Sequence, residues 1–142
     1  MMTTDATTMQ SDTQRIAIKS QVENIALIEK VIDEICNANN ITEEHYGNVL
    51  IAITEGVNNA INHGNKQDSS KEVVVEFAVS EKQLVCKITD QGPGFDYENV
   101  PDPTSPENIE KPNGRGVFLM RHLSDEIEFE DNGAVVILKF SL

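Results

Sequence analysis

The stretch Ile53-Thr54-Glu55-Gly56-Val57-Asn58-Asn59-Ala60-Ile61-Asn62-His63-Gly64 is the most informative part of the sequence, and its spacing predicts a helix with one apolar and one polar face. The apolar stripe begins before this stretch and consists of Tyr46, Val49, Leu50, Ile53, Val57, Ala60 and Ile61. The polar face consists of Glu55, Asn58, Asn59 and Asn62. Asn disfavours helix interiors because its side chain competes for backbone hydrogen bonds. No Lys or Arg between Lys30 and Lys66 can pair with the acids of this helix. The polar face therefore predicts a ligand site, with a frayed polar helix end as the alternative.

Composition limits the kinds of partner. The 142 residues carry a formal net charge of −13, which argues against binding nucleic-acid backbones and anionic membranes. No apolar run reaches membrane-spanning length, and the first residues lack the basic region and apolar core of a signal peptide. We therefore expect a cytoplasmic protein with a disordered tail over residues 1–14 and one domain over residues 15–142. A phosphate ligand would need a metal ion or a local basic exception.

The cysteines and histidines do not indicate a redox or zinc site. Cys36 falls on the apolar stripe of a predicted helix and Cys86 alternates with apolar residues along a predicted strand, so both are expected to be small buried hydrophobes. His45, His63 and His122 are scattered and lack the spacing of zinc ligands.

Periodicity assigns the remaining elements. The expected elements of the first half are an edge strand over Arg15–Lys19, a helix over Val22–Asn39, a second helix from its N-cap Thr42 to about Gly64, and a hairpin of Val73–Val79 and Leu84–Thr89. The second half is expected to contain a long loop over residues 96–113, a helix from Val117 to about Ser124, and a hairpin of Glu126–Glu130 and Ala134–Phe140 turned at Asp131-Asn132-Gly133. Strands and helices do not alternate, which excludes a doubly wound dinucleotide fold. The order predicts a two-layer α/β sandwich, with a mixed, mostly antiparallel sheet and helices on one face.

Two glycine-containing segments could contact a ligand. In Asp90-Gln91-Gly92-Pro93-Gly94, a carboxylate at a strand end could accept a hydrogen bond from an exocyclic amine such as that of adenine, with glycines that let the backbone approach a flat ring. The alternative is an ordinary turn. Gly114-Arg115-Gly116 precedes an apolar helical run, so its N–H groups could bind a phosphate, with Arg115 as the basic exception. The alternative is a glycine-flanked helix start with an exposed Arg.

Together these segments resemble the three motifs of the Bergerat-fold ATPases, the superfamily of gyrase, heat-shock chaperone and sensor histidine kinase ATP domains. Glu55-x-x-x-Asn59-Ala60 resembles the N box, Asp90-x-Gly92-x-Gly94 the first glycine box, and Gly114-x-Gly116 the second. Within that superfamily the short chain, the run from Asn59 to Gly64 and the run from Gly114 to Met120 look most like the bacterial anti-sigma factor serine/threonine kinases.

The resemblance implies a role for each motif. Asn59 would coordinate the Mg²⁺ that bridges the ATP phosphates, Glu55 would be the general base, and Asn62 would join the polar pocket. Asp90 would bind the adenine amino group, in a pocket shaped by Gly92 and Gly94. Gly114, Arg115 and Gly116 would cradle the phosphates under a lid of residues 96–113. For His63 a phosphate contact and a structural role at the helix end both stay open. The chain departs from many relatives at Ala134, where a Thr hydroxyl would lie near the nucleotide.

Two functions follow from the resemblance. The first is a serine/threonine kinase that phosphorylates an anti-sigma antagonist and also binds a sigma factor. The alternative is a non-catalytic, nucleotide-controlled module that binds partners; the presence of Glu55 beside Asn59 and Asp90 favours the kinase. A homodimer is compatible with both, and an ATPase fragment that dimerises by strand exchange is a third, weaker interpretation.

Overall fold

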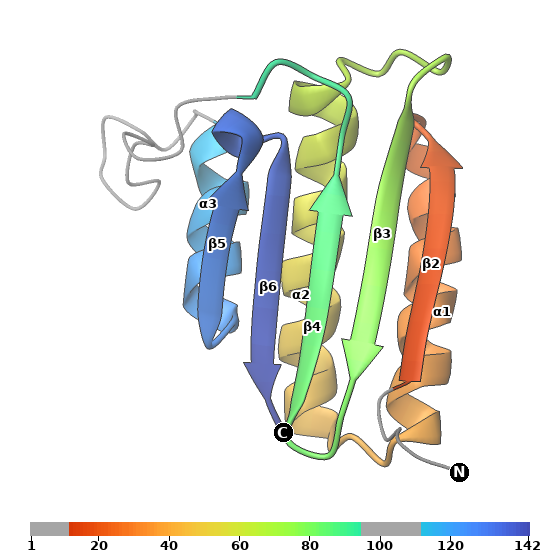
Figure 1. Cartoon of the computed structure of the whole chain (residues 1–142), viewed down its shortest axis with the longest axis vertical. Helices are drawn as coiled ribbons and strands as arrows, with labels where there is room; N and C mark the ends of the chain where they lie inside the picture. The colour runs from red at the N-terminus through yellow and green to blue at the C-terminus, as the bar shows by residue number, and fades with distance from the viewer. Residues whose placement is uncertain (1–11, 95–111) are drawn as a thin grey trace, which may run out of the picture.

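The computed structural model describes residues 12–94 and 112–142 (Figure 1). Its elements are β2 (Asp12–Lys19), a 3-10 turn (Val22–Asn24), α1 (Ile25–Ala38), α2 (Glu43–Asn59), a π-helical turn (Ala60–Gly64), β3 (Glu72–Val79), β4 (Gln83–Thr89), α3 (Pro112–Leu123), β5 (Glu126–Glu130), a second 3-10 turn (Asp131–Gly133) and β6 (Val135–Ser141). The strands form one sheet in the order β2-β3-β4-β6-β5. All four pairings between these strands are antiparallel.

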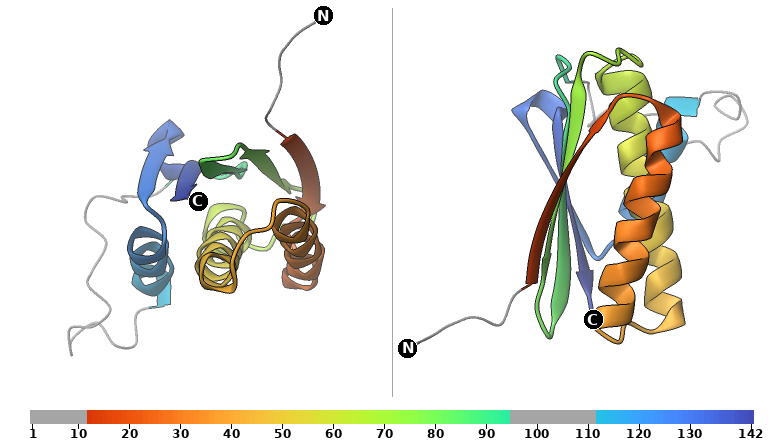
Figure 2. Two further views of the ribbon diagram at one scale, coloured as in Figure 1. Left: turned by 90° about the horizontal axis from the view of Figure 1, so that it is seen from below. Right: turned by 90° about the vertical axis from the view of Figure 1, so that its right-hand side faces the viewer.

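The helices cover one face of this sheet (Figure 2). Alternation along the strands explains why: Val73, Val75, Phe77 and Val79 of β3 and Leu84, Cys86 and Ile88 of β4 are buried, whereas the residues between them are half-exposed on the opposite face. The predicted two-layer α/β sandwich is confirmed. The expected burial of both cysteines is confirmed too, since Cys36 and Cys86 are buried and unpaired.

The central helix α2 lies against the sheet, between α1 and α3 (Figure 2). Its predicted N-cap is present, because the hydroxyl of Thr42 accepts a hydrogen bond from the backbone N–H of His45. Gly56 allows close packing: a Cβ at this position would lie 2.6 Å from Cδ1 of Ile88 in β4 and 3.2 Å from Sδ of Met120 in α3. Gly56 therefore lets α2 pack closely against both β4 and α3.

The structure corrects two boundaries. β2 begins at Asp12, so residues 12–14 pair with β3 instead of belonging to the predicted tail; residues 1–11 lie outside the described part of the chain. α3 begins at Pro112, not at Val117, because proline suits the first helical position and the two glycines that follow are accommodated within the helix. The lid expected over residues 96–113 falls, up to residue 111, outside the described residues. None of the described helices combines the length and the apolar composition of a membrane span.

The two faces of β6 provide a test of the layer arrangement. Leu138 is fully buried under the helices, whereas its neighbour Ile137 is half-buried on the open face. We predict that Leu138→Ala lowers the free energy of unfolding by about 2–5 kcal/mol, the cost of a core cavity, and that Ile137→Ala costs clearly less. Urea denaturation of both variants measures the difference. Equal losses would contradict the assignment of the helix-covered face.

Candidate functional site

Asn59 and Gly116 bring the end of α2 against the start of α3. A Cβ at Gly116 would lie 2.5 Å from Nδ2 and 2.7 Å from Oδ1 of Asn59. Real side chains do not tolerate such distances, so only glycine allows the Asn59 carboxamide to lie on the α3 backbone. The first and third motifs singled out in the sequence are therefore in direct contact.

Asp90 and Gly92 lie against the turn that follows α2. A Cβ at Gly64 would overlap the carboxyl group of Asp90, and a Cβ at Gly92 would overlap the carbonyl oxygen of Gly64. The Gly92 N–H donates to Oδ1 of Asp90 at 2.8 Å, and the Asp90 N–H donates at 2.9 Å to the carbonyl of Ala134, which directly precedes β6. The second motif thus reaches the carboxyl end of the same helix that carries the first.

Gly94 lies against the turn of the hairpin formed by β5 and β6. Its φ of +88° is in the left-handed region that favours glycine, and a Cβ there would overlap the carbonyl oxygen of Asn132. The Asn-Gly turn of that hairpin is confirmed, with positive φ at Asp131, Asn132 and Gly133. The glycines at positions 92 and 94 are therefore required by close backbone contacts on two sides of the segment.

Glu55 lies one helical turn before Asn59 and is half-buried. The described residues offer its carboxylate no hydrogen-bond or ion-pair partner. A free carboxylate next to a carboxamide on the same helix can accept a proton or contribute oxygen ligands to a hard cation. Among the described residues no group of three or more His, Cys, Asp or Glu side chains forms a ready-made metal site.

The side-chain amide of Asn62 is hydrogen-bonded to two neighbouring side-chain amides. Its Nδ2 donates to Oδ1 of Asn58 at 2.8 Å, and its Oδ1 accepts from Nε2 of Gln67 at 2.6 Å. The carboxamide thus belongs to a chain of amides that starts on α2, and its place in a nucleotide pocket stays a prediction. His63 is exposed in the turn after α2.

The second glycine segment lies inside α3 instead of in front of it. The N–H groups of the first helical turn have no acceptor within the helix, and proline at position 112 has no N–H. The N–H groups available to an anion are consequently the remaining ones of this first turn, directly after Pro112. Arg115 is exposed at this end.

Burial sets the acidity of Asp90. Partial burial of the carboxyl group raises its pKa, while the hydrogen bond from the Gly92 N–H and the charge of Lys71 act in the opposite direction and do not cancel the effect of burial. A carboxylate that is partly removed from water gains more from a new hydrogen-bond donor than an exposed one would.

The burial of Asn65 and Ser20 was not predicted from the sequence. These two polar residues are buried, with 1% and 0% of their surfaces exposed, and their side chains are hydrogen-bonded to each other. Asn65 lies in the polar run Gly64-Asn65-Lys66-Gln67-Asp68, which has the composition of an exposed turn, so no local signal indicated its burial.

Two depressions in the described surface lie away from these residues. One, of about 400 Å³, lies over β2, β3 and β4 and is lined by Thr13, Gln14, Arg15, Glu76, Phe77, Ala78, Val85 and Lys87. The other, of about 300 Å³, lies between α1 and α2 beside Asp33 and Tyr46. Neither contains a residue of the three motifs, so the candidate site is defined by the convergence of those motifs.

Comparisons with known proteins show the family of this chain. The family model described as histidine kinase-like ATPase domain matches residues 18–140. Proteins named Serine-protein kinase RsbW from Oceanobacillus iheyensis and Bacillus cereus (strain AH187) are 24% and 28% identical to this chain, over 85% of its length in both cases and over 80% and 79% of theirs. A crystal structure of the RsbU and RsbW domains of Rv1364c from Mycobacterium tuberculosis aligns with a TM-score of 0.63 at 15% identity. That alignment covers 92% of this chain but only 32% of the larger one, and at this identity it shows the fold alone.

The raised pKa of Asp90 generates a prediction about stability. Its pKa in the folded protein lies above the ordinary value, so its contribution to stability is full below the ordinary pKa and is lost as the pH rises through the folded pKa. We therefore predict that Asp90→Asn is more stable relative to the wild type at pH 7 than at pH 3, measured by urea denaturation across this range.

Asp68 serves as the control with the opposite sign. Hydrogen bonds from the Ser70 hydroxyl and N–H lower the pKa of its carboxyl group, so Asp68→Asn should be less stable relative to the wild type at pH 7 than at pH 3. A stability difference for Asp90→Asn that does not change with pH would contradict the burial of its carboxylate.

Proposed function

Because the chain belongs to the family of histidine kinase-like ATPase domains, we propose that it binds ATP with Mg²⁺ and phosphorylates a serine or threonine of an anti-sigma antagonist protein. The same proposal includes binding of a sigma factor in a second complex. The observation that carries it is the contact of Asn59 with Gly116, at the helix end where Asp90 meets Gly64. Three segments far apart in the sequence thereby meet at one helix end, which supports a single site built from them.

The adenine base would bind at Asp90. Oδ1 already accepts the Gly92 N–H, which leaves Oδ2 to accept a hydrogen bond from the exocyclic amine. Gly92 and Gly94 would allow the base to approach the backbone. Ala134 supplies no hydroxyl to the nucleotide, but its carbonyl fixes the Asp90 backbone, so the position still contributes to the pocket.

The phosphates and their metal ion would lie between α2 and α3. Mg²⁺ prefers oxygen ligands, and the Asn59 carboxamide, with Glu55 one turn away, supplies oxygens of that kind. Gly116 fits the same interpretation, because the lack of a Cβ lets the Asn59 carboxamide lie directly beside the α3 backbone. Bound Mg²⁺ would supply positive charge that offsets the phosphates within a chain of net charge −13.

Glu55 would act as the general base. Its carboxylate is unengaged among the described residues, so it can accept the proton of the attacking hydroxyl while that oxygen bonds to the γ-phosphorus and ADP leaves. The names of the relatives, Serine-protein kinase RsbW, support a hydroxyl side chain as the acceptor.

Metal dependence tests the phosphate half of the site. We predict that ADP and ATP bind with Mg²⁺ and lose at least about tenfold in affinity when EDTA removes it, because the uncompensated phosphates would meet Glu55 and the surrounding acids. Isothermal titration calorimetry measures both conditions. Equal affinities would mean that Asn59 does not take part in metal binding.

Glu55→Gln tests the kinase. The change preserves size but removes the base, so phosphate transfer to the antagonist should fall by about 10²- to 10⁴-fold while Mg-ATP still binds. Glu44→Gln is the matched control, since Glu44 lies on the same helix in its first turn and should leave transfer unchanged. Transfer is followed with labelled ATP and antagonist-type proteins of the same genome.

Three results of this experiment have different meanings. Full transfer by Glu55→Gln would remove Glu55 from the mechanism. Absence of transfer by the wild type, together with ATP-dependent binding of partners, would favour the nucleotide-controlled binding module instead. Absence of both ATP binding and transfer would reject the proposed function as a whole.

A further inference from the structure

Asn65 occupies a buried position directly after the turn that ends α2. Its backbone N–H donates to the carbonyl of Ala60 at 2.8 Å, which closes the π-helical turn. Its side chain then points into the protein, where 1% of the residue surface is exposed. A buried carboxamide must have its polar atoms paired, because an unpaired one costs about 1–3 kcal/mol. Its partners therefore indicate what it holds.

Both ends of the Asn65 carboxamide are bonded to backbone groups of other segments. Oδ1 accepts from the N–H of Gln91 at 2.7 Å, and Nδ2 donates to the carbonyl of Glu72 at 3.0 Å. One partner is a donor and the other an acceptor, so the amide has a single orientation. The second hydrogen of Nδ2 goes to Oγ of Ser20 at 2.8 Å.

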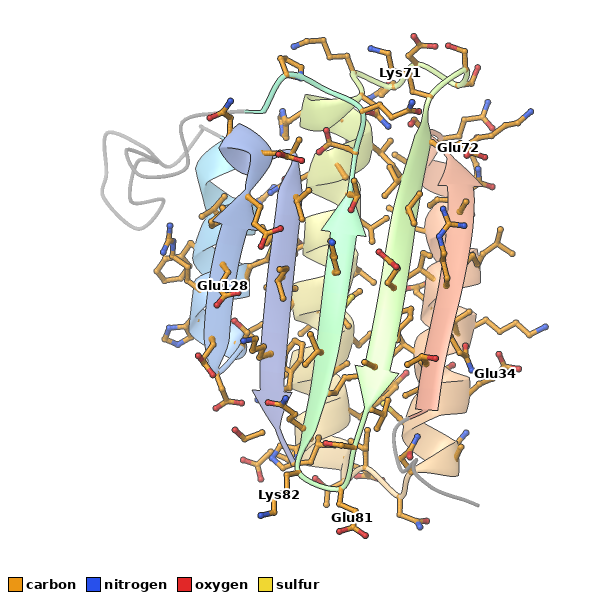
Figure 3. All side chains as sticks on the ribbon, viewed as in Figure 1. Glu34, Lys71, Glu72, Glu81, Lys82 and Glu128 are labelled. Atoms are coloured by element: carbon orange, nitrogen blue, oxygen red, sulfur yellow. The ribbon has the colours of Figure 1, made fainter. Side chains whose placement is uncertain are left out.

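Gln91 is held twice by this network. Its N–H is bonded to Asn65, and its side-chain Oε1 accepts the N–H of Glu72 at 2.6 Å. Figure 3 shows Lys71 and Glu72 at the end of the sheet where β3 begins. Gln91 stands between Asp90 and Gly92, the two residues that pack on Gly64. Fixing Gln91 therefore fixes the residue on each side of it.

Ser20 belongs to the same network but does not touch the nucleotide segment. Its hydroxyl donates to the carbonyl of Lys71 at 2.7 Å and accepts from Asn65, so it joins the end of β2 to the start of β3. It is as completely buried as Asn65. The molecule thus offers one residue of the network, Asn65, that is bonded directly to Gln91 and one, Ser20, that is not.

We propose that Asn65 is a positioning residue for adenine recognition. Through the bond from its Oδ1 to the Gln91 N–H, it keeps the Asp90 carboxylate at the place where it accepts the exocyclic amine. The inference rests on the proposed function, in which Asp90 binds adenine. It adds a residue outside the three motifs that determines how strongly the site prefers an amino-purine.

The test compares ATP with purine riboside triphosphate, which lacks the exocyclic amine. The wild type should prefer ATP by about ten- to a hundredfold, the range expected for a hydrogen bond to a charged acceptor. Asn65→Leu, which retains volume but removes the bond to Gln91, should reduce this preference by about tenfold. Ser20→Ala should lower the denaturation midpoint and leave the preference as in the wild type.

A structural role alone predicts a different pattern. It would weaken both nucleotides equally in Asn65→Leu, and an unchanged preference for ATP would overturn the proposal. If Asn65→Leu does not fold, Asn65→Ala replaces it, because the smaller side chain leaves room for a water molecule. An unchanged preference in Asn65→Ala overturns the proposal in the same way. A wild type that binds neither nucleotide, or both equally, instead contradicts the role of Asp90 in the proposed function.

Discussion

Close backbone packing at the carboxyl end of α2 is the constraint on which the site depends. Gly64 lies against the Asp90 carboxyl group, Gly92 lies against the Gly64 carbonyl, and Gly116 lies against the Asn59 carboxamide. A Cβ at any of these three glycines would force a neighbour to move, and at Gly92 that neighbour is backbone. These glycines therefore allow the turn after α2, the end of β4 and the start of α3 to lie in close contact with Asp90 and Asn59 in their present positions. Glycine is needed at these three positions for space, whereas Gly94 also has a positive φ.

The distribution of charge explains how so acidic a chain could bind a polyanion. The residue of α2 that faces the second glycine segment is a carboxamide, Asn59, whereas the carboxylate of Asp90 lies against Gly64 in the turn after the helix. Asp90 is partly buried at a cost that raises its pKa. Such an unfavourable burial is expected where a ligand, rather than the protein, provides the final hydrogen bond. Under the proposed function, the exocyclic amine of the nucleotide would provide that bond.

Much of the fold follows from sequence, because strand alternation, the Thr42 N-cap and the Asn-Gly turn are local signals. The boundaries at Asp12 and Pro112 do not follow, since polar residues in β2 and glycines in α3 are tolerated only through pairing with β3 and packing on α2. The motif residues were found because their types are unusual for their positions. Asn65 was missed because its burial arises only where three strand ends converge, and nothing local marks it.

Amide chemical shifts in a ¹⁵N-labelled sample, recorded before and after addition of Mg-ADP, show whether the three motifs form one nucleotide site. We expect the largest changes to occur together at Asn59, at Gly92 and at residues 113–116, because the nucleotide would touch all three segments at once. Changes confined to the depression over β2, β3 and β4, or changes at one of the three segments without the others, would contradict a single site built by their convergence.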